Sequence, residues 1–466
     1  MTATVTNWPQ RIAYGLPAFA LAVVGIPVYV YLPKFYSDVV GIDIALMGFI
    51  LLAVRLFDAV SDPVIGLLSD RTTSRFGRRR PYIAVGGAGV ALAMVFLFAP
   101  PRGTSIDPTI WFTFWIFTLF IFWTLVTVPY ESLGPEISYD YTDRTTLFAI
   151  RDGLLIAGTL AAAAAPALVA AIWQTPPSPE GERQKFLLIG LIYAPILVGT
   201  CLWCVYRIRE QPPLPASPSS FSGGRWRAVW RNRPFMLLLA AYTISAIGSN
   251  LPATLILYYV QYVLQSSKAD LFLILYLTTG VVFLPAWIAI ARRIGKKDAW
   301  LAAMTINTGV FMGVFFLGPG DEILYGLLVF GSGLGFGASL ALPSAIQADV
   351  IDYDELLTGM RREGRYIGLW SIAKKMAAAA GVGIGLAVLG GVGYTPNVEQ
   401  PEAVVMTLRV LYALVPCLCN IAAILIIWRF PLNARAHRDI RAAIQSRRET
   451  GASLSDPLRP GRQIVA

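Results

Sequence analysis

The chain has 466 residues, of which 56% are hydrophobic and only 14% are charged, and its mean hydropathy is +0.60. Soluble domains carry about 25% charged residues, so this composition excludes a soluble enzyme or binding module. The net charge of +10 does not indicate a nucleic-acid partner, because the basic residues cluster in short loops between apolar runs and no groove-reading motif is present.

Repeated apolar runs of about 20 residues or more predict an all-α membrane protein that crosses the lipid bilayer many times. We expect twelve transmembrane helices in two pseudo-symmetric six-helix bundles. The expected spans are 12–37, 44–70, 80–100, 108–138, 144–173, 185–208, 234–263, 268–292, 298–318, 322–350, 364–391 and 403–429.

A segment rich in Pro, Ser and Gly at 209–230 predicts a cytoplasmic linker. It separates an N-terminal bundle at 1–208 from a C-terminal bundle at 231–430, which a basic tail at 431–466 follows. Basic residues concentrate in one set of loops, such as 71–80, and are nearly absent from the other set. The positive-inside rule therefore places both termini and the tail in the cytoplasm. We expect a monomer in the plasma membrane, which is the inner membrane in a bacterium.

One polar stripe lies inside the second expected span. Arg55, Asp58 and Asp62 stand at positions i, i+3 and i+7, so they share one helical face, and Ser61 lies beside it. Each central charge costs roughly 2.5–3.5 kcal/mol to insert into a bilayer. The stripe must therefore face the protein interior, and an ion or proton pathway is the first hypothesis for it. The alternative is that both aspartates only neutralise Arg55 and another buried cation.

The residues that usually carry catalysis or bind transition metals are nearly absent from the spans. All four cysteines, Cys201, Cys204, Cys417 and Cys419, fall within apolar runs, where we expect them to pack. The single histidine, His437, lies in the polar tail. No nucleophile–base pair or metal cluster is readable, so neither an enzyme nor a cofactor is expected.

Several motifs give the chain a family resemblance. Gly66, Asp70 and Arg71, followed by a Gly-Arg-Arg run at 77–79, are similar to the cytoplasmic loop signature of the major facilitator superfamily. Four segments resemble the glycoside–pentoside–hexuronide:cation symporters of that superfamily, at 57–63, 128–136, 348–355 and 358–366. The resemblance covers nearly the whole chain up to about Arg429, and it implies the major facilitator fold and transport by alternating access.

In that family, carboxylates on the second helix bind the coupling cation, and Asp58 and Asp62 stand at their positions. Ser61 stands where a polar Asn often occurs, and Thr124 matches a hydroxyl ligand on the fourth helix. Sodium is a hard cation that prefers oxygen ligands. Two carboxylates at i and i+4 repel each other, so one of them holds a proton when no cation is bound. The coupling ion is therefore sodium or a proton.

The resemblance also implies that Arg151 and Lys375 contact the solute, with Lys374 as an adjacent candidate. Each could instead be a plain charge partner. The family's two sugar-binding aspartates are missing: Thr127 stands at the second, and Glu131 replaces the aromatic residue that follows it. This loss argues against a galactoside. Glu131 either contacts the solute or neutralises Arg151.

The basic loop at 71–80 is expected to act as a gate that grips acidic helix ends of the same or the opposite bundle. Exposed ion pairs of about 0–1 kcal/mol each are weak enough to break in every transport cycle. The expected gating residues are Asp70, Arg71, Arg78, Arg79, Glu136, Asp140, Asp349 and Asp352.

Three functions remain. The first is symport of a small sugar or glycoside-like solute with sodium or a proton. The second is cation-coupled transport of an amphiphile such as a lysophospholipid, because the sugar carboxylates are missing and sodium-dependent lysophospholipid symporters share this framework. The third is a membrane sensor that does not transport, against which the intact intramembrane charges argue. Tyr130 and Trp370 are candidate solute-cavity aromatics in either transporter, and ordinary packing is the alternative role for both.

Overall fold

The computed structural model describes residues 6–72, 74–103, 106–138, 141–176, 178–208, 210, 232–358, 363–450, 454–458 and 463–464. Within that part, twelve helical segments are long and apolar enough to cross a membrane, which confirms the predicted number of spans. Nearly all of the linker expected at 209–230, and the gating candidate Asp140, lie outside the described residues.

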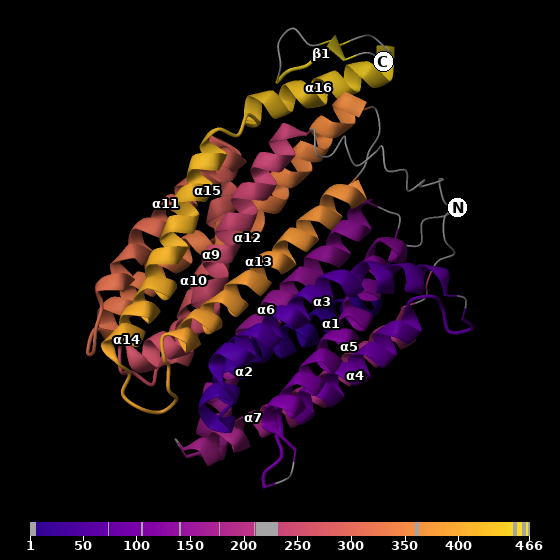
Figure 1. Ribbon diagram of the computed structural model, residues 1–466. Helices are drawn as coiled ribbons and strands as arrows, with labels where there is room; N and C mark the ends of the chain where they lie inside the picture. Colours follow the sequence, from indigo (N-terminus) through magenta and orange to yellow (C-terminus); the bar gives the residue numbers. More distant parts are fainter. Residues whose placement is uncertain are drawn as a thin grey trace.

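The helices of the first group, drawn in indigo to magenta in Figure 1, are α1 (Trp8–Ile26), α2 (Leu32–Lys34), α3 (Ile44–Arg71), α4 (Arg80–Phe98), α5 (Pro108–Ile137), α6 (Tyr141–Trp173) and α7 (Pro179–Arg207). Those of the second group are α9 (Arg233–Tyr262), α10 (Ala269–Ile294), α11 (Lys296–Met312), α12 (Glu322–Thr358), α13 (Glu363–Gly391), α14 (Glu402–Arg409) and α15 (Val415–Trp428). In the first group α1 packs against α6 and α4 packs against α5 and α7; in the second, α9 packs against α15, and α12 against α10 and α11.

The first span is longer than predicted and irregular. It runs from Trp8 to Val40, because α1 and α2 are joined by a π-helical turn and α2 continues into a second one. Pro27 begins the first wide turn and Pro33 precedes the second, and each proline lacks the N–H group that a regular helix would use. The span ends at Gly41, whose φ of 91° lets its N–H cap the last turn.

The two helix groups meet closely along α3 and α13, which Figure 1 shows side by side. Glycines make this approach possible. A Cβ added at Gly48 would lie 3.0 Å from the Cβ of Leu386, and one added at Gly383 would lie 2.8 Å from the Cβ of Leu52. Small residues of this kind let transmembrane helices approach each other backbone to backbone.

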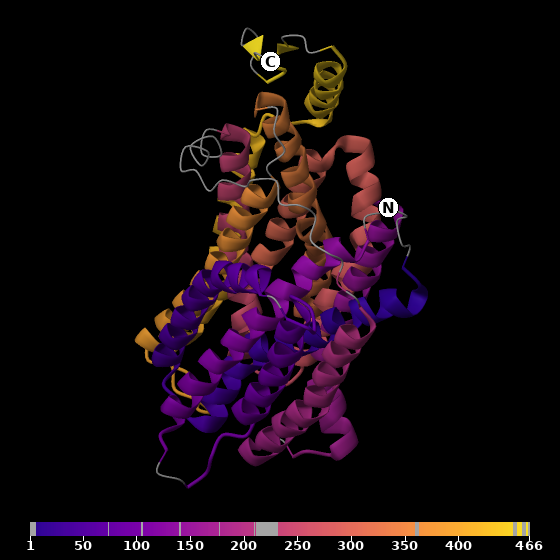
Figure 2. The same cartoon turned by 90° about the vertical axis from the view of Figure 1, so that its right-hand side faces the viewer.

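The connections between the spans lie at two opposite ends of the molecule, which are called the Asp38 end and the Asp70 end. The Asp38 end contains the connections at 41–43, 263–268 and 392–401, and the Asp70 end is the opposite one, with the connection at 72–79. In Figures 1 and 2, α16 (Ala434–Thr450) lies beyond the spans at the Asp70 end.

The basic tail folds in part onto the membrane-spanning helices. Helix α16 packs against α12 and buries Ile440 completely. Beyond it, β1 (Leu454–Ser455) and β2 (Gln463–Ile464) form a short antiparallel pair, and Asp456 accepts a hydrogen bond from Tyr353 on α12 at 3.0 Å. An apolar residue on the inner face of α16 is what lets this basic segment dock on the protein.

Candidate functional site

The polar stripe of the second span meets a lysine from the other helix group. Nζ of Lys375, on α13, lies 2.9 Å from Oδ2 of Asp58 and 2.5 Å from Oδ2 of Asp62, both on α3. One ammonium group therefore bridges two carboxylates across the seam between the groups. The side chain of Asp58 is 3% exposed, whereas those of Lys375 and Asp62 are 23% and 24% exposed. The Asp58 end of the bridge is therefore the more deeply buried one.

Hydroxyl groups complete the surroundings of the carboxylates. Thr124 on α5 donates a hydrogen bond to Oδ1 of Asp58 at 2.7 Å. Ser61 donates to the backbone carbonyl of Asp58, and its Oγ lies 3.3 Å from the side-chain oxygen of Thr124. Oδ1 of Asp62 is buried and has no hydrogen-bond partner among the described residues. Two carboxylates, one of them with an oxygen that lacks a partner, and two hydroxyls form a set of oxygen ligands that suits a hard monovalent cation.

Arg55 does not neutralise the aspartates, although all three share one helix face. Its guanidinium lies 4.0 Å from the ring centroid of Tyr29 and 4.8 Å from that of Phe120. The physical reason is the direction of the side chain. Side chains on an α-helix lean toward the N-terminus, so that of Arg55 extends toward the Asp38 end and away from Asp58. The cation that pairs with the stripe is Lys375, which comes from another span.

Other charged solute candidates lie near this bridge. Arg151 on α6 pairs with its neighbour Asp152 at 2.7 Å and lies over the ring of Phe148. Glu131 on α5 is exposed and makes no ion pair with a described residue. Of the two adjacent lysines, Lys375 reaches the aspartates, while Lys374 is exposed and unpaired within the described part of the chain.

The three uncharged candidates for contacts with the solute already make hydrogen bonds or ring contacts with the protein itself in this conformation. The hydroxyl of Thr127 bonds to the carbonyl of Trp123 within the same helix. That of Tyr130 bonds to the carbonyl of Tyr14, and the Tyr130 side chain is buried. Trp370 is also buried and stacks on a neighbouring aromatic ring. Tyr130 and Trp370 thus contribute to packing between helices here, whereas the Thr127 hydroxyl is satisfied within its own helix.

At the Asp70 end, the gating candidates pair within their own helix group. In the first group, Arg78 and Arg79 bind Glu136 at 2.7 and 2.8 Å, and Arg79 binds Asp70 at 3.0 Å. Arg71 is exposed.

The gating carboxylates of the second group contact a lysine of that group and a histidine of the tail helix. Lys296 binds Asp349 at 2.6 Å, and His437 of the tail helix lies 3.4 Å from Asp349 and 3.0 Å from Asp352. Glu210 was not singled out from the sequence, yet it accepts backbone hydrogen bonds from three consecutive arginines at 78–80.

The Asp38 end carries a polar network that the sequence analysis missed. Asp38 lies in the first group and is nearly buried, and Lys34 pairs with it at 2.6 Å. Ser37 donates a hydrogen bond to the same carboxylate. Tyr394 and Tyr262, both from the second group, donate to it at 2.7 and 3.1 Å. One carboxylate thus holds donors from both groups.

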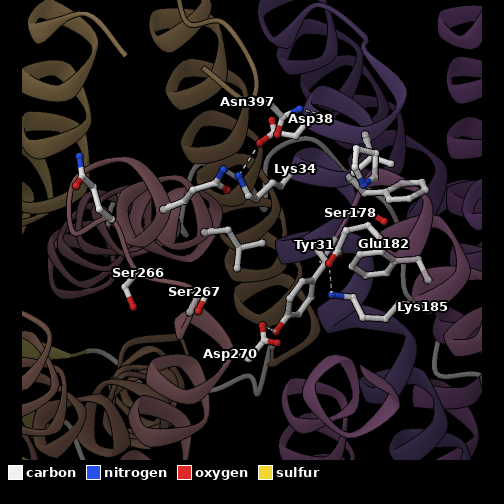
Figure 3. A pocket seen from close by; sticks show the side chains of 18 residues that line it. Tyr31, Lys34, Asp38, Ser178, Glu182, Lys185, Ser266, Ser267, Asp270 and Asn397 are labelled. Carbon is white, nitrogen blue, oxygen red and sulfur yellow. Dashed lines mark hydrogen bonds and ion pairs between the residues drawn. The ribbon is translucent and has the colours of Figure 1, made fainter. Parts of the chain in front are cut away.

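Further contacts at this end also join the two groups. Asn397 donates to the backbone carbonyl of Asp38 at 2.6 Å, and Tyr31 donates to Asp270 at 2.8 Å. Figure 3 shows these side chains around a cavity of about 590 Å³, with Lys185 and Glu182 beside Tyr31. The signal in the sequence was the Lys34-x-x-x-Asp38 pair at the end of a span, at helical i, i+4 spacing.

The distribution of these contacts defines the state of the molecule. Polar contacts between the two groups occur at the Asp38 end and at Lys375. At the Asp70 end, every ion pair that joins two described residues stays within one group. The groups are therefore latched at the Asp38 end and not by such pairs at the other.

Comparison with known proteins gives consistent results. The profile of a family described as "MFS/sugar transport protein" matches residues 13–434. The chain is 28% identical to the glucuronide carrier protein homolog of Escherichia coli K12, over 96% of this chain and 98% of that one. It is 27% identical to the putative sulfoquinovose importer of Salmonella typhimurium, over 96% and 94%. It is 26% identical to the isoprimeverose transporter of Lactiplantibacillus pentosus, over 88% and 85%.

Solved structures agree on the fold. The nucleoside transporter NupG superposes with a TM-score of 0.61 at 13% identity, over 90% of this chain and 99% of that one. A bacterial homologue of the human drug peptide transporters PepT1 and PepT2 superposes with a TM-score of 0.66 at 12% identity, over 94% and 99%. These similarities show a shared architecture of membrane-spanning helices.

Proposed function

This chain belongs to the MFS/sugar transport protein family, the glycoside–pentoside–hexuronide:cation symporters, and we propose that its coupling cation binds between Asp58 and Asp62. The protein is a multi-pass membrane transporter and not an enzyme, and it moves sugar or glycoside-like solutes together with a cation. The single observation that supports the cation site is the double ion pair of Lys375 with both aspartates.

Orientation follows from charge. The Asp70 end carries the basic loops, so it faces the cytoplasm, and the Asp38 end faces outward. In this orientation, the contacts between the two groups at the Asp38 end would latch the carrier on its outer side. The parts that rock against each other are residues 1–208 and 231–430, joined by the linker at 209–230.

Lys375 acts as a tethered substitute for the coupling cation. Two adjacent carboxylates without a partner would be costly in a low-dielectric span. The ammonium of Lys375 offsets one of the two negative charges of Asp58 and Asp62 after the cation has left to the cytoplasm, so the empty carrier can return. Sodium or a proton arriving from outside then competes with Lys375 for the same oxygens.

Coupling arises because cation and solute favour the same arrangement of helices. Binding of the cation releases α13 from its bridge to α3, since Lys375 loses its partners. The solute site near Arg151 and Glu131 lies beside that seam. A cation gradient therefore drives accumulation only if the aspartates can bind the ion.

The test uses purified protein in liposomes and an imposed inward sodium or proton gradient. The solutes are p-nitrophenyl β-D-glucuronide, β-D-glucoside and β-D-xyloside, and the readout is accumulation inside. We expect at least one of them to be concentrated, and Asp58→Asn to abolish this. The matched control is Asp298→Asn, an exposed carboxylate on α11, which should transport normally. Concentrative uptake by Asp58→Asn would refute the cation site.

A further inference from the structure

One carboxylate outside the cation site organises the loop that carries the gating arginines. The backbone N–H of Arg78 donates to Oε2 of Glu210 at 2.6 Å, and those of Arg79 and Arg80 donate to its Oε1 at 2.8 Å each. Three consecutive donors thus converge on one side chain that is 130 to 132 positions away in the chain. Glu210 stands at the start of the linker expected at 209–230, so the contact ties the beginning of that segment to the gating loop.

The backbone on both sides of this contact is shaped to admit the carboxylate. Gly77 has a φ of 106°, which favours glycine, and a Cβ added there would lie 2.7 Å from Oε1 of Glu210. On the other side, the chain leaves α7 at Ile208, which is 1% exposed, and α7 packs against α4. The buried Ile208 therefore carries Glu210 to the N-terminus of α4.

Helix α4 needs a remote carboxylate because its own sequence supplies no cap. Its N-cap residue is Arg79, whose side chain makes no capping hydrogen bond, and its first turn contains no acidic residue. A negative charge is favourable at a helix N-terminus, where unpaired N–H groups and the helix dipole meet. An Asp or Ser at position 79 would cap the helix locally, but it would remove a gating arginine. Glu210 supplies the cap from another segment, so position 79 can remain an arginine.

The contact also leaves the side chains of the gating arginines available to other partners. Glu210 accepts from their backbone N–H groups, whereas the guanidinium groups of Arg78 and Arg79 bind Glu136 at 2.7 and 2.8 Å. Arg79 also binds Asp70 at 3.0 Å. Because backbone and side chains are held by different carboxylates, the arginines can change their side-chain partners by rotation, without refolding of the loop.

We propose that Glu210 is a positioning residue for transport, which fixes the backbone from which Arg78 and Arg79 exchange carboxylate partners while the two groups rock. The inference rests on the proposed alternation of the two groups and goes beyond the cation site. Asp349 and Asp352, the gating carboxylates of the second group, are the receivers across the seam. A loop whose backbone is already held loses less conformational freedom when its side chains bind new partners. Glu210 therefore acts on the moving step and not on the affinity for cation or solute.

The first experiment separates the moving step from binding. Glu210→Gln keeps the shape of the side chain but turns Oε2, which faces the N–H of Arg78, into an amide donor. The assay is uptake into liposomes of whichever of the three p-nitrophenyl glycosides accumulates fastest. We expect the maximal rate to fall about tenfold or more, because a charge-assisted contact with three donors is lost. The apparent affinity for the driving cation, sodium or proton, should not change.

Two outcomes would overturn the proposal. One is a normal maximal rate in Glu210→Gln, and the other is a loss of cation affinity together with the rate, which would show a merely structural role. Asp298→Asn is the matched control, because Asp298 is an exposed acidic residue in the first turn of α11 at the same end of the molecule. It should transport at the normal rate.

A spectroscopic measurement tests the loop itself. A spin label at position 76, which is exposed in the loop, should become more mobile in Glu210→Gln. Its distance to a second label at position 294, in the second group, should become more broadly distributed in double electron–electron resonance. Asp298→Asn should change neither quantity. Unchanged mobility of the loop label in Glu210→Gln would contradict the positioning role.

A second variant keeps the proposal testable if Glu210→Gln does not fold. Gly77→Ala places a methyl group against Oε1 of Glu210, so it should lower the maximal rate in the same way at unchanged cation affinity, and a normal rate would count against the proposal. The unmodified protein separates the two levels of inference. If it accumulates a glycoside and both variants match its rate, the positioning role fails and symport stands. If it accumulates none of the three glycosides, the proposed function itself fails.

Discussion

The two ends of the molecule close by different chemistry. At the Asp38 end, a nearly buried carboxylate collects an ammonium and tyrosine hydroxyls from both helix groups. At the Asp70 end, arginines, a lysine and a histidine meet carboxylates of their own group, and the side chain of Asp70 is 55% exposed. The Asp38 end is therefore held by buried hydrogen bonds that converge on one carboxylate from both groups. The charges of the Asp70 end, in contrast, pair within each group among the described residues and do not join the two groups.

Magnitudes explain why the structure is latched where it is. A hydrogen bond to a charged group contributes about 1.5–3 kcal/mol, and several of them converge on Asp38. Exposed ion pairs contribute about 0–1 kcal/mol each. The Asp38 end is therefore held more strongly than the Asp70 end. We propose that the arginines of the Asp70 end exchange partners across the seam when the two groups rock.

The largest effect is expected for Asp38→Asn, which weakens the more strongly held of the two ends. The change leaves Lys34 buried without a counter-charge, and removing one partner of a buried pair costs about 3–5 kcal/mol. We expect the population open at the Asp38 end to rise by about 100-fold or more. Spin labels at positions 180 and 398, one in each group, would report this as a longer distance in double electron–electron resonance. An unchanged distance distribution would show that Asp38 is not the latch.

A smaller effect is expected for Tyr394→Phe, which removes one hydrogen bond to Asp38 and keeps the charge pair. The bond contributes about 1.5–3 kcal/mol, so the open population should rise by roughly ten- to a hundredfold. The same labelled pair measures it. Tyr412→Phe is the matched control, because Tyr412 bonds Tyr325 inside the second group. It should lower thermal stability without opening the latch, and an equal opening by both variants would contradict the expectation.

The smallest effect is expected for Asp70→Asn at the opposite end. Its pair with Arg79 is largely exposed, and Glu136 remains as a partner for that arginine, so the loss is about 0–1 kcal/mol. We expect less than about fivefold change in the open population of the Asp38 end. The transport rate under a gradient should fall by a larger factor than this population changes, because the proposed exchange of arginine partners takes place while the two groups rock. If Asp70→Asn raised the population open at the Asp38 end as much as Asp38→Asn does, the two ends would not differ in strength as proposed.

Much of the fold was readable from local patterns. Long apolar runs determined the twelve spans, because a bilayer requires about 20 apolar residues per helix. The irregular first span was not predicted in detail, since a π-helical turn depends on the packing around Pro27 and Pro33 as well as on the prolines themselves. The docking of α16 was also missed, because one apolar position such as Ile440 does not predict which surface will cover it.

The sequence by itself determined that Asp58 and Asp62 share a buried face, because helical periodicity is a property of neighbouring residues. Only the tertiary structure decided that Lys375 bridges them, that Arg55 turns away to aromatic rings, and that Tyr394 closes on Asp38 from 356 positions along the chain. The physical reason is one of range. Insertion costs and helix geometry act within a span, whereas the choice of partner for each charge depends on how two separate helix groups approach each other.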